Sequence, residues 1–287
     1  MMANIDFFIS SLKSYQYLQN AMIAGILVGI ICGFIGCFII LRGMALMGDA
    51  ISHAVLPGVV IAYLLGFSFF IGAVISGVIT AIGIGYVTQH SKIKDDSAIG
   101  IMFTAAFALG IVLITAQQGT EVHLWHILFG NVLAVSRVDL WVTLGVGVVV
   151  IGIILLFYRS FLLSTFDPVM SQAIGLPTKA IHYLLMLMLS LVTVAALNTV
   201  GIVLVVAMLI TPGATAYLLT DRFCIMLVLS AVFGVVSSIF GVYFSFIYDV
   251  ATGASIVLVA SFLFTLAFLF GPKQGVIKKF GACRQKT

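Results

Sequence analysis

The fold of this chain is decided by residues 183–220, YLLMLMLSLVTVAALNTVGIVLVVAMLITPGATAYLLT, which contain no charged side chain. A helix needs about 20 predominantly apolar residues to cross a lipid bilayer. This stretch is 38 residues long, close to twice that length. We therefore expect two membrane-spanning helices here, joined near residues 198–200.

Uncharged runs of similar character fill most of the remaining chain. They cover residues 21–41, 54–89, 97–120, 140–158, 223–248 and 250–272. The run at 54–89 is again long enough to fold back once. Of the 287 residues, 63% are hydrophobic and 8% are charged, and the mean hydropathy is +1.30. These values are typical of an all-α, polytopic integral membrane protein with about nine spans, eight at the fewest and ten at the most. No linker divides the chain, so we expect one transmembrane domain over residues 1–287.

The charged residues indicate the orientation of the chain. Basic side chains gather in the loops near residues 42, 92–94, 159–179 and 222 and in the C-terminal tail, about 272–287. The positive-inside rule places these loops in the cytoplasm, and the N-terminus then lies outside. The net charge of +4 is not concentrated on one face, which argues against a nucleic-acid partner. No cleavable signal peptide is visible, and the first span serves as the targeting signal.

An aspartate and a histidine stand within the apolar sequence GDAISHAVLPG, residues 48–58. Asp49 and His53 are four residues apart and therefore share one face of a helix. Ionisable residues inside a span usually mark an ion or substrate pathway. The alternatives are a structural hydrogen-bonded pair, a location in the membrane interface near Arg42, or a proton relay. As a metal site, a carboxylate and an imidazole suit Mn(II), Fe(II) or Zn(II) better than Cu(I). Two ligands are too few, and a second copy of the chain across a two-fold axis would supply two more.

The loop 164–177 is too polar to cross the membrane and carries helix start and stop signals. Asp167 followed by Pro168 is typical of a helix start, and Gly175 and Pro177 of its end. We expect a short helix of about two turns on the cytoplasmic face. It is either a surface helix without a partner or a docking element for another subunit.

Small residues and prolines predict features of helix packing. Gly25, Gly29 and Gly33 repeat every four residues, which favours close approach of another helix. Pro57 and Pro212 stand inside apolar runs. They indicate either broken helices, as in many transporters, or ordinary proline kinks.

A second polar cluster, Glu121, His123 and His126, lies in a connection that we expect to be external. It is interpreted as an outer vestibule for a cation, or as an interfacial helix anchored by Trp125. The spacing is not that of a zinc-protease helix. The chain also lacks a phosphate-binding loop and a serine nucleophile elbow. We therefore expect no enzyme activity in this chain and no bound cofactor, and ATP hydrolysis on a partner.

Four segments together resemble a known family. They are LRGMALMGDAISHAVLPG (41–58), HILFGNVLAV (126–135), FDPVMSQAIGLP (166–177) and VGIVLVVAMLITPGATAYL (200–218). The chain is similar, nearly end to end, to the membrane permeases of ABC-type manganese, zinc and iron importers. Within them it resembles most the manganese permeases of Gram-positive bacteria.

The resemblance implies a homodimer in the bacterial cell membrane. Its expected partners are membrane lipid, two cytoplasmic ABC ATPase subunits and an extracytoplasmic metal-binding lipoprotein. Asp49 and His53 then become ligands of the transported metal, Mn(II) in preference to Zn(II) or Fe(II). The helix that starts at Asp167 and includes Ala173 and Gly175 becomes the ATPase-coupling element. The rival functions are a metal-chelate permease and an intramembrane hydrolase built on Glu121, His123 and His126.

Overall fold

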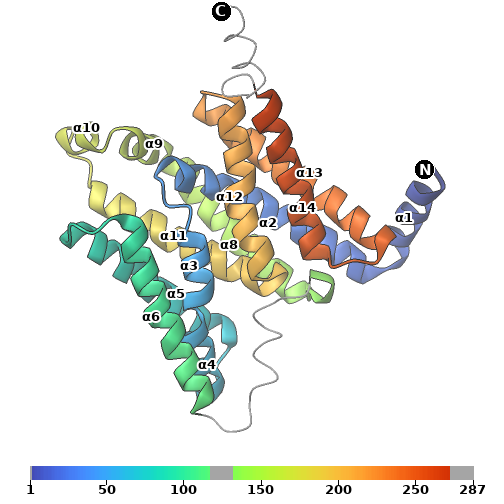
Figure 1. The fold of residues 1–287 in the computed structure, drawn as a ribbon, viewed down its shortest axis with the longest axis horizontal. Coiled ribbons are helices and arrows are strands. Elements are labelled where there is room, and N and C mark those ends of the chain that lie inside the picture. The colour runs from blue at the N-terminus through green and yellow to red at the C-terminus, as the bar shows by residue number, and fades with distance from the viewer. Residues whose placement is uncertain (1, 117–131, 272–287) are drawn as a thin grey trace, which may run out of the picture. The chain divides into compact units, whose positions relative to one another are not determined.

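In the computed structural model of the protein, residues 2–116 and 132–271 are described, and they form helices and no strand (Figure 1). The predicted all-α class is confirmed for this part of the chain. The helices are α1 (Met2–Ser14), α2 (Gln16–Leu41), α3 (Met47–Ala54), α4 (Leu56–Leu65), α5 (Phe69–His90), α6 (Asp95–Thr115), the 3₁₀ turn η1 (Val132–Ala134), α8 (Arg137–Leu156), α9 (Tyr158–Phe166), α10 (Pro168–Ala173), α11 (Thr178–Val200), α12 (Ile202–Leu219), α13 (Phe223–Tyr248) and α14 (Thr252–Phe270).

Nine spans within the described residues are long and apolar enough to cross a membrane, which confirms the predicted number. Helices suit this setting because they satisfy every backbone polar group internally where lipid offers no hydrogen bonds. The long run at 54–89 turns at residues 66–68 between α4 and α5, as predicted. The run at 183–220 is interrupted at Gly201, where the φ of 84° suits glycine and ends α11.

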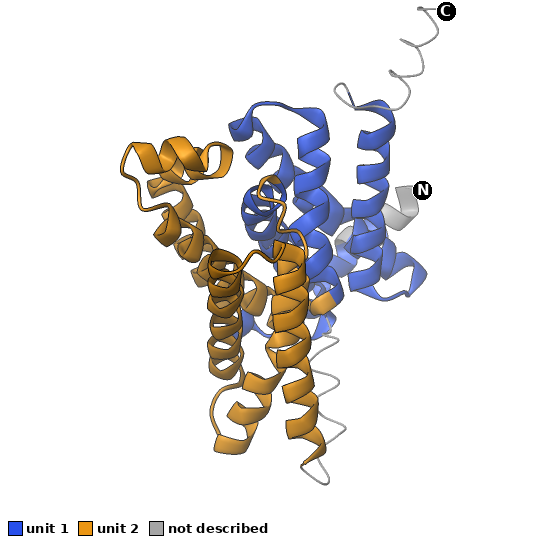
Figure 2. Cartoon of the chain, turned by 60° about the vertical axis from the view of Figure 1, so that its left-hand side comes forward, with its two compact units in different colours: residues 1–40, 131–140, 203–287 blue, residues 41–130, 141–202 orange. Residues whose placement is uncertain are grey.

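The chain forms two compact units, coloured separately in Figure 2. Unit 1 comprises residues 1–40, 131–140 and 203–287, and unit 2 comprises residues 41–130 and 141–202. Each unit combines segments that are distant in sequence, so neither is a separate stretch of chain. The single transmembrane domain stays a prediction.

In unit 1, α2 and α13 pack at close distance through small residues. A Cβ placed on Gly29 would lie 2.8 Å from the carbonyl carbon of Gly234 on α13. On either side of this contact, Ser230 donates a hydrogen bond of 2.9 Å to the Gly33 carbonyl, and Ser238 one of 2.8 Å to the Gly25 carbonyl. The predicted glycine face is therefore confirmed. Its close approach lets serine hydroxyls bond across the helix pair.

Sequence analysis did not anticipate helix α1. Its Phe8 is buried against two aromatic rings of α13, with centroid distances of 5.2 Å to Tyr243 and 5.7 Å to Phe246. The segment has mixed polarity and is too short to span a bilayer. For that reason no apolar run of membrane-spanning length marks it in the sequence.

In unit 2, α4 and α5 pack almost backbone to backbone. A Cβ on Gly72 would overlap the carbonyl oxygen of Gly58 and lie 2.9 Å from its carbonyl carbon. Close to this contact, the Ser76 hydroxyl donates a hydrogen bond of 2.7 Å to the carbonyl of Ala54, the last residue of α3. Helix α5 therefore holds both α4 and the end of α3.

The two prolines behave differently. Before Pro57 the helix is interrupted at Val55 alone, which keeps right-handed helical angles between α3 and α4. Pro212 lies inside α12, which is assigned as helix from Ile202 to Leu219. The helical assignment therefore has a one-residue interruption two residues before Pro57 and no interruption at Pro212.

Candidate metal-binding site

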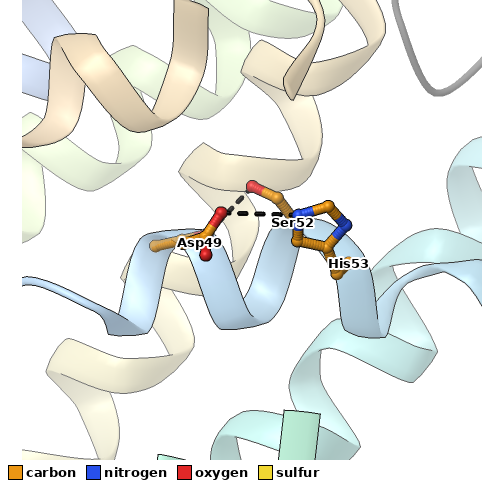
Figure 3. A network of polar contacts seen from close by, with 4 residues as sticks. Asp49, Ser52 and His53 are labelled. Carbon is orange, nitrogen blue, oxygen red and sulfur yellow. Dashed lines mark hydrogen bonds and ion pairs between the residues drawn. The ribbon is translucent and has the colours of Figure 1, made fainter. Parts of the chain in front are cut away.

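The structure brings Asp49 and His53 together on α3, in unit 2. Figure 3 shows both side chains on one side of the helix, where His53 Nε2 lies 3.5 Å from Asp49 Oδ1. The Asp49 side chain is 44% exposed and that of His53 is 30% exposed. Both side chains are thus partly buried and partly exposed. Its oxygen and nitrogen atoms remain reachable by a ligand from outside.

Helix α3 is fixed by contacts of its other residues. Ile51 is fully buried, and its Cγ2 would lie 3.5 Å from a Cβ placed on Gly77, so α3 packs against α5 at this point. Ser52 is also buried and returns its hydroxyl hydrogen bond to the Gly48 carbonyl at 2.8 Å (Figure 3). Because Ser52 is satisfied within α3, it does not compete for Asp49 or His53. The buried face positions the helix, and the polar pair is presented from another face.

Two aromatic residues of α6 contact the imidazole. The ring centroids of Phe103 and Phe107 each lie 5.5 Å from that of His53, and 6.1 Å from one another. They are four residues apart and share one face of α6. They restrict the rotation of the His53 ring and shield one side of it. Their spacing of four residues is visible in the sequence, but no local signal indicates that they contact His53. For that reason they were not predicted as part of the site.

The pair makes an incomplete metal site in a single chain. Among the described residues, no group of three or more histidine, cysteine, aspartate or glutamate side chains could hold a metal ion. A transition metal ordinarily takes four or more ligands. Asp49 and His53 therefore supply at most part of a coordination shell.

The predicted loop 164–177 contains the predicted short helix, α10, but residues 164–166 form the end of helix α9. Asp167 caps it, because its Oδ1 accepts a hydrogen bond of 2.8 Å from the Met170 backbone N–H. After Ala173 the helix ends, and Gly175 has a φ of 85°, in the left-handed region. The predicted start and stop are both confirmed.

Three apolar side chains are exposed on α10 and on the residue that follows it. Ser171 is buried, whereas Val169, Met170 and Ile174 are 77%, 49% and 59% exposed. Three neighbouring apolar side chains at a helix surface suit contact with another protein. Sequence analysis singled out the backbone signals at Asp167 and Gly175 and did not note this apolar face.

The third predicted cluster cannot be placed. Glu121, His123 and His126 lie outside the described residues, as does the basic tail 272–287. The interpretation of the histidine cluster as an outer vestibule stays a prediction.

Nine apolar spans within the described residues, a polar pair in one of them and a capped helix with an exposed apolar face are features of a polytopic membrane protein. Residues 14–271 match the ABC 3 transport family, to which the chain therefore belongs. It is a multi-pass bacterial membrane protein and a permease of the ABC transporter class.

Individual relatives cover nearly the whole chain. It is 76% identical to the manganese transport system membrane protein MntC of Halalkalibacterium halodurans, over 97% of this chain and 96% of that one. It is 48% identical to the manganese import system permease protein ScaB of Streptococcus gordonii, over 96% and 99%. Among solved structures it is similar to PsaBC from Streptococcus pneumoniae in complex with Fab. That match has a TM-score of 0.85 and 48% identity, and covers 96% of this chain and 99% of the other.

Proposed function

We propose that this chain is the membrane subunit of an importer that carries Mn(II) into the cell. A separate cytoplasmic ATPase supplies the energy. The Asp49–His53 pair on α3 carries the proposal, because it is a metal-ligating pair inside an otherwise apolar span. The manganese names of relatives that are 76% and 48% identical favour manganese as the cargo.

The ligand types suit Mn(II) but do not distinguish it from Fe(II) or Zn(II). A carboxylate oxygen and an imidazole nitrogen are suitable ligands for Mn(II), Fe(II) and Zn(II). For such ligands, intrinsic affinity rises from Mn(II) through Fe(II), and Zn(II) binds more tightly than either. Selection of manganese therefore depends on coordination geometry and on metal supply. Import of Zn(II) or Fe(II) is the alternative cargo for the same site.

Two copies of the chain complete the site in this proposal. Asp49 and His53 of each copy meet at a two-fold axis and give two carboxylates and two imidazoles around one ion. The partial exposure of both side chains, 44% and 30%, supports this because a second chain can reach them. A shell assembled between subunits can also be opened when the subunits move.

In this proposal the ATPase acts on the permease through its contact with α10. The ATPase binds the exposed side chains of Val169, Met170 and Ile174, while Asp167, Ala173 and Gly175 fix the shape of the helix. One ATPase subunit serves each permease of the dimer. A metal-binding lipoprotein delivers the ion on the outer side and thereby sets the direction of transport.

The test is transport by the purified permease and its ATPase, reconstituted in liposomes with the lipoprotein. We expect Asp49→Asn and His53→Gln each to lower Mn²⁺ uptake at least tenfold while the complex still assembles. Asp96→Asn and His90→Gln serve as matched controls, because both native residues are exposed and lie outside α3. Uptake at the native level in both site variants would contradict the proposal.

The same preparation separates the rival functions. A metal-chelate permease would take up a chelated metal and would tolerate Asp49→Asn. An intramembrane hydrolase would cleave a peptide substrate in a metal-dependent way without ATP, and His126→Ala would abolish that cleavage. We expect neither activity.

A further inference from the structure

Arg42 stands at the junction between the proposed metal site and the proposed ATPase contact. It follows the last residue of α2 and precedes α3, the helix that carries Asp49 and His53. All of its described hydrogen-bond partners belong to unit 2, as Arg42 itself does. Residues 43–46 join it to the start of α3.

The guanidinium of Arg42 reaches two other helices. Its Nη2 donates to Ser164 Oγ at 2.7 Å and its Nε donates to Thr165 Oγ1 at 3.1 Å, both on α9 just before α10. Its Nη1 lies 3.2 Å from His182 Nδ1 on α11. Because a guanidinium can only donate, the imidazole accepts this bond and carries its own proton on Nε2.

This arrangement is not an ordinary ion pair. Within the described residues, no carboxylate oxygen lies within 4.0 Å of the Arg42 nitrogens. The side chain is partly buried, and the loss of water lowers the pKa of Arg42, although a guanidinium stays charged at neutral pH. The desolvated charge is compensated by three neutral acceptors. A planar group with donors in fixed directions orients its partners more strictly than a lysine ammonium does.

A cavity with many polar lining residues adjoins Arg42. A cavity of about 520 Å³ is lined by Arg42 and by residues of α5, α6, α9, α10 and α11, including Lys179 and Asp95. Gln172 of α10 also lines it. The guanidinium is therefore placed where the α9–α10 segment adjoins the rest of unit 2.

We propose that Arg42 is a positioning residue that couples movement of the ATPase-contacting segment to the helix that bears the metal ligands. Its hydrogen bonds make Ser164 and Thr165 move together with the start of α3, so that displacement of α10 shifts Asp49 and His53. The inference rests on the proposed function, because it takes the chain to be part of an ATP-driven Mn²⁺ importer. It concerns Arg42, and its measured quantity is the number of ions moved per ATP hydrolysed.

The test measures two rates on the same reconstituted complex, Mn²⁺ uptake and ATP hydrolysis. We expect Arg42→Gln to hydrolyse ATP within about threefold of the native rate while the ions moved per ATP fall at least tenfold. The double variant Ser164→Ala/Thr165→Val keeps the Arg42 charge but removes two acceptors, and we expect its ratio to fall as well. A role in stability alone would lower both rates together and leave the ratio unchanged.

Two further variants separate geometry from charge. Lys179→Gln removes a positive charge from the same cavity without touching the three hydrogen bonds, and we expect a native ratio. Arg42→Lys keeps the charge but cannot donate in three fixed directions, and we expect it not to restore coupling. Full restoration by lysine would show that charge suffices and would overturn the proposal.

The remaining outcomes are also decisive. A native ratio of ions to ATP in Arg42→Gln would refute the coupling role. If Arg42→Gln fails to assemble with the ATPase, the Ser164→Ala/Thr165→Val variant decides the question. A native ratio of ions to ATP in that variant overturns the proposal, and a reduced ratio supports it. Failure of the proposed function is separate, because it shows as native uptake in both Asp49→Asn and His53→Gln.

Discussion

Replacement of Gly72 by alanine tests the packing that holds the metal-ligand helix. The added Cβ would overlap the carbonyl oxygen of Gly58, lie 2.9 Å from its carbonyl carbon and lie 2.6 Å from the Cβ of Ala62. Ordinary contact begins at 3.4 Å, and two of these neighbours are backbone atoms that cannot rotate away. Helices α4 and α5 would have to separate by about 1 Å, and overpacking of this kind costs about 1–3 kcal/mol.

The separation also affects function, because Ser76 on α5 bonds to the Ala54 carbonyl directly after His53. We expect Gly72→Ala to lower the free energy of unfolding by about 2–3 kcal/mol and to reduce Mn²⁺ uptake. Thermal unfolding of the purified protein in lipid nanodiscs and uptake in liposomes measure the two effects. The matched control is Gly100→Ala on α6, where an added Cβ meets nothing within 4 Å. If Gly72→Ala is as stable as Gly100→Ala, the reasoning from backbone contact is wrong.

Three further predictions concern other contacts. Gly29→Ala places a Cβ 2.8 Å from the Gly234 backbone, so we expect a loss of about 1–3 kcal/mol in thermal unfolding; stability equal to native would contradict the α2–α13 contact. Phe107→Ala frees one side of the His53 ring and should raise the Mn²⁺ concentration for half-maximal uptake severalfold, with little change in protein yield; an unchanged value would show that the ring contact does not position His53. Asp167→Ala removes the cap of α10, which is worth about 1 kcal/mol, and should weaken co-purification of the ATPase. Asp167→Asn retains a cap and serves as the control. Equal co-purification of both variants and the native chain would refute this role.

The helices that span the membrane were predictable because lipid leaves the chain few alternatives. Long uncharged runs must form helices there, and run length then gives the number of spans. The start and stop of α10 were also predictable, since Asp167 and Gly175 act through local backbone chemistry. Helix α1 was missed because its mixed polarity gave no comparable signal, and its place depends on Phe8 meeting α13.

The candidate site was predictable only in part. The spacing of Asp49 and His53 is local, and the structure has them on one face of α3 as expected. Phe103 and Phe107 belong to another helix, so their contact with His53 depends on tertiary packing. Likewise, the sequence marks Arg42 only as a basic loop residue. Its bonds to Ser164, Thr165 and His182 arise from packing between segments more than 100 residues apart.

The central claim is that a transition metal passes through the Asp49–His53 site. The most direct measurement is the cellular content of manganese, iron and zinc, determined by elemental analysis. The cells lack other manganese importers and express the ATPase and lipoprotein with either the native chain or the Asp49→Ala/His53→Ala variant at equal membrane levels. We predict a selective loss of manganese in the variant. Equal manganese in both strains would contradict the claim and leave Asp49 and His53 as a structural pair.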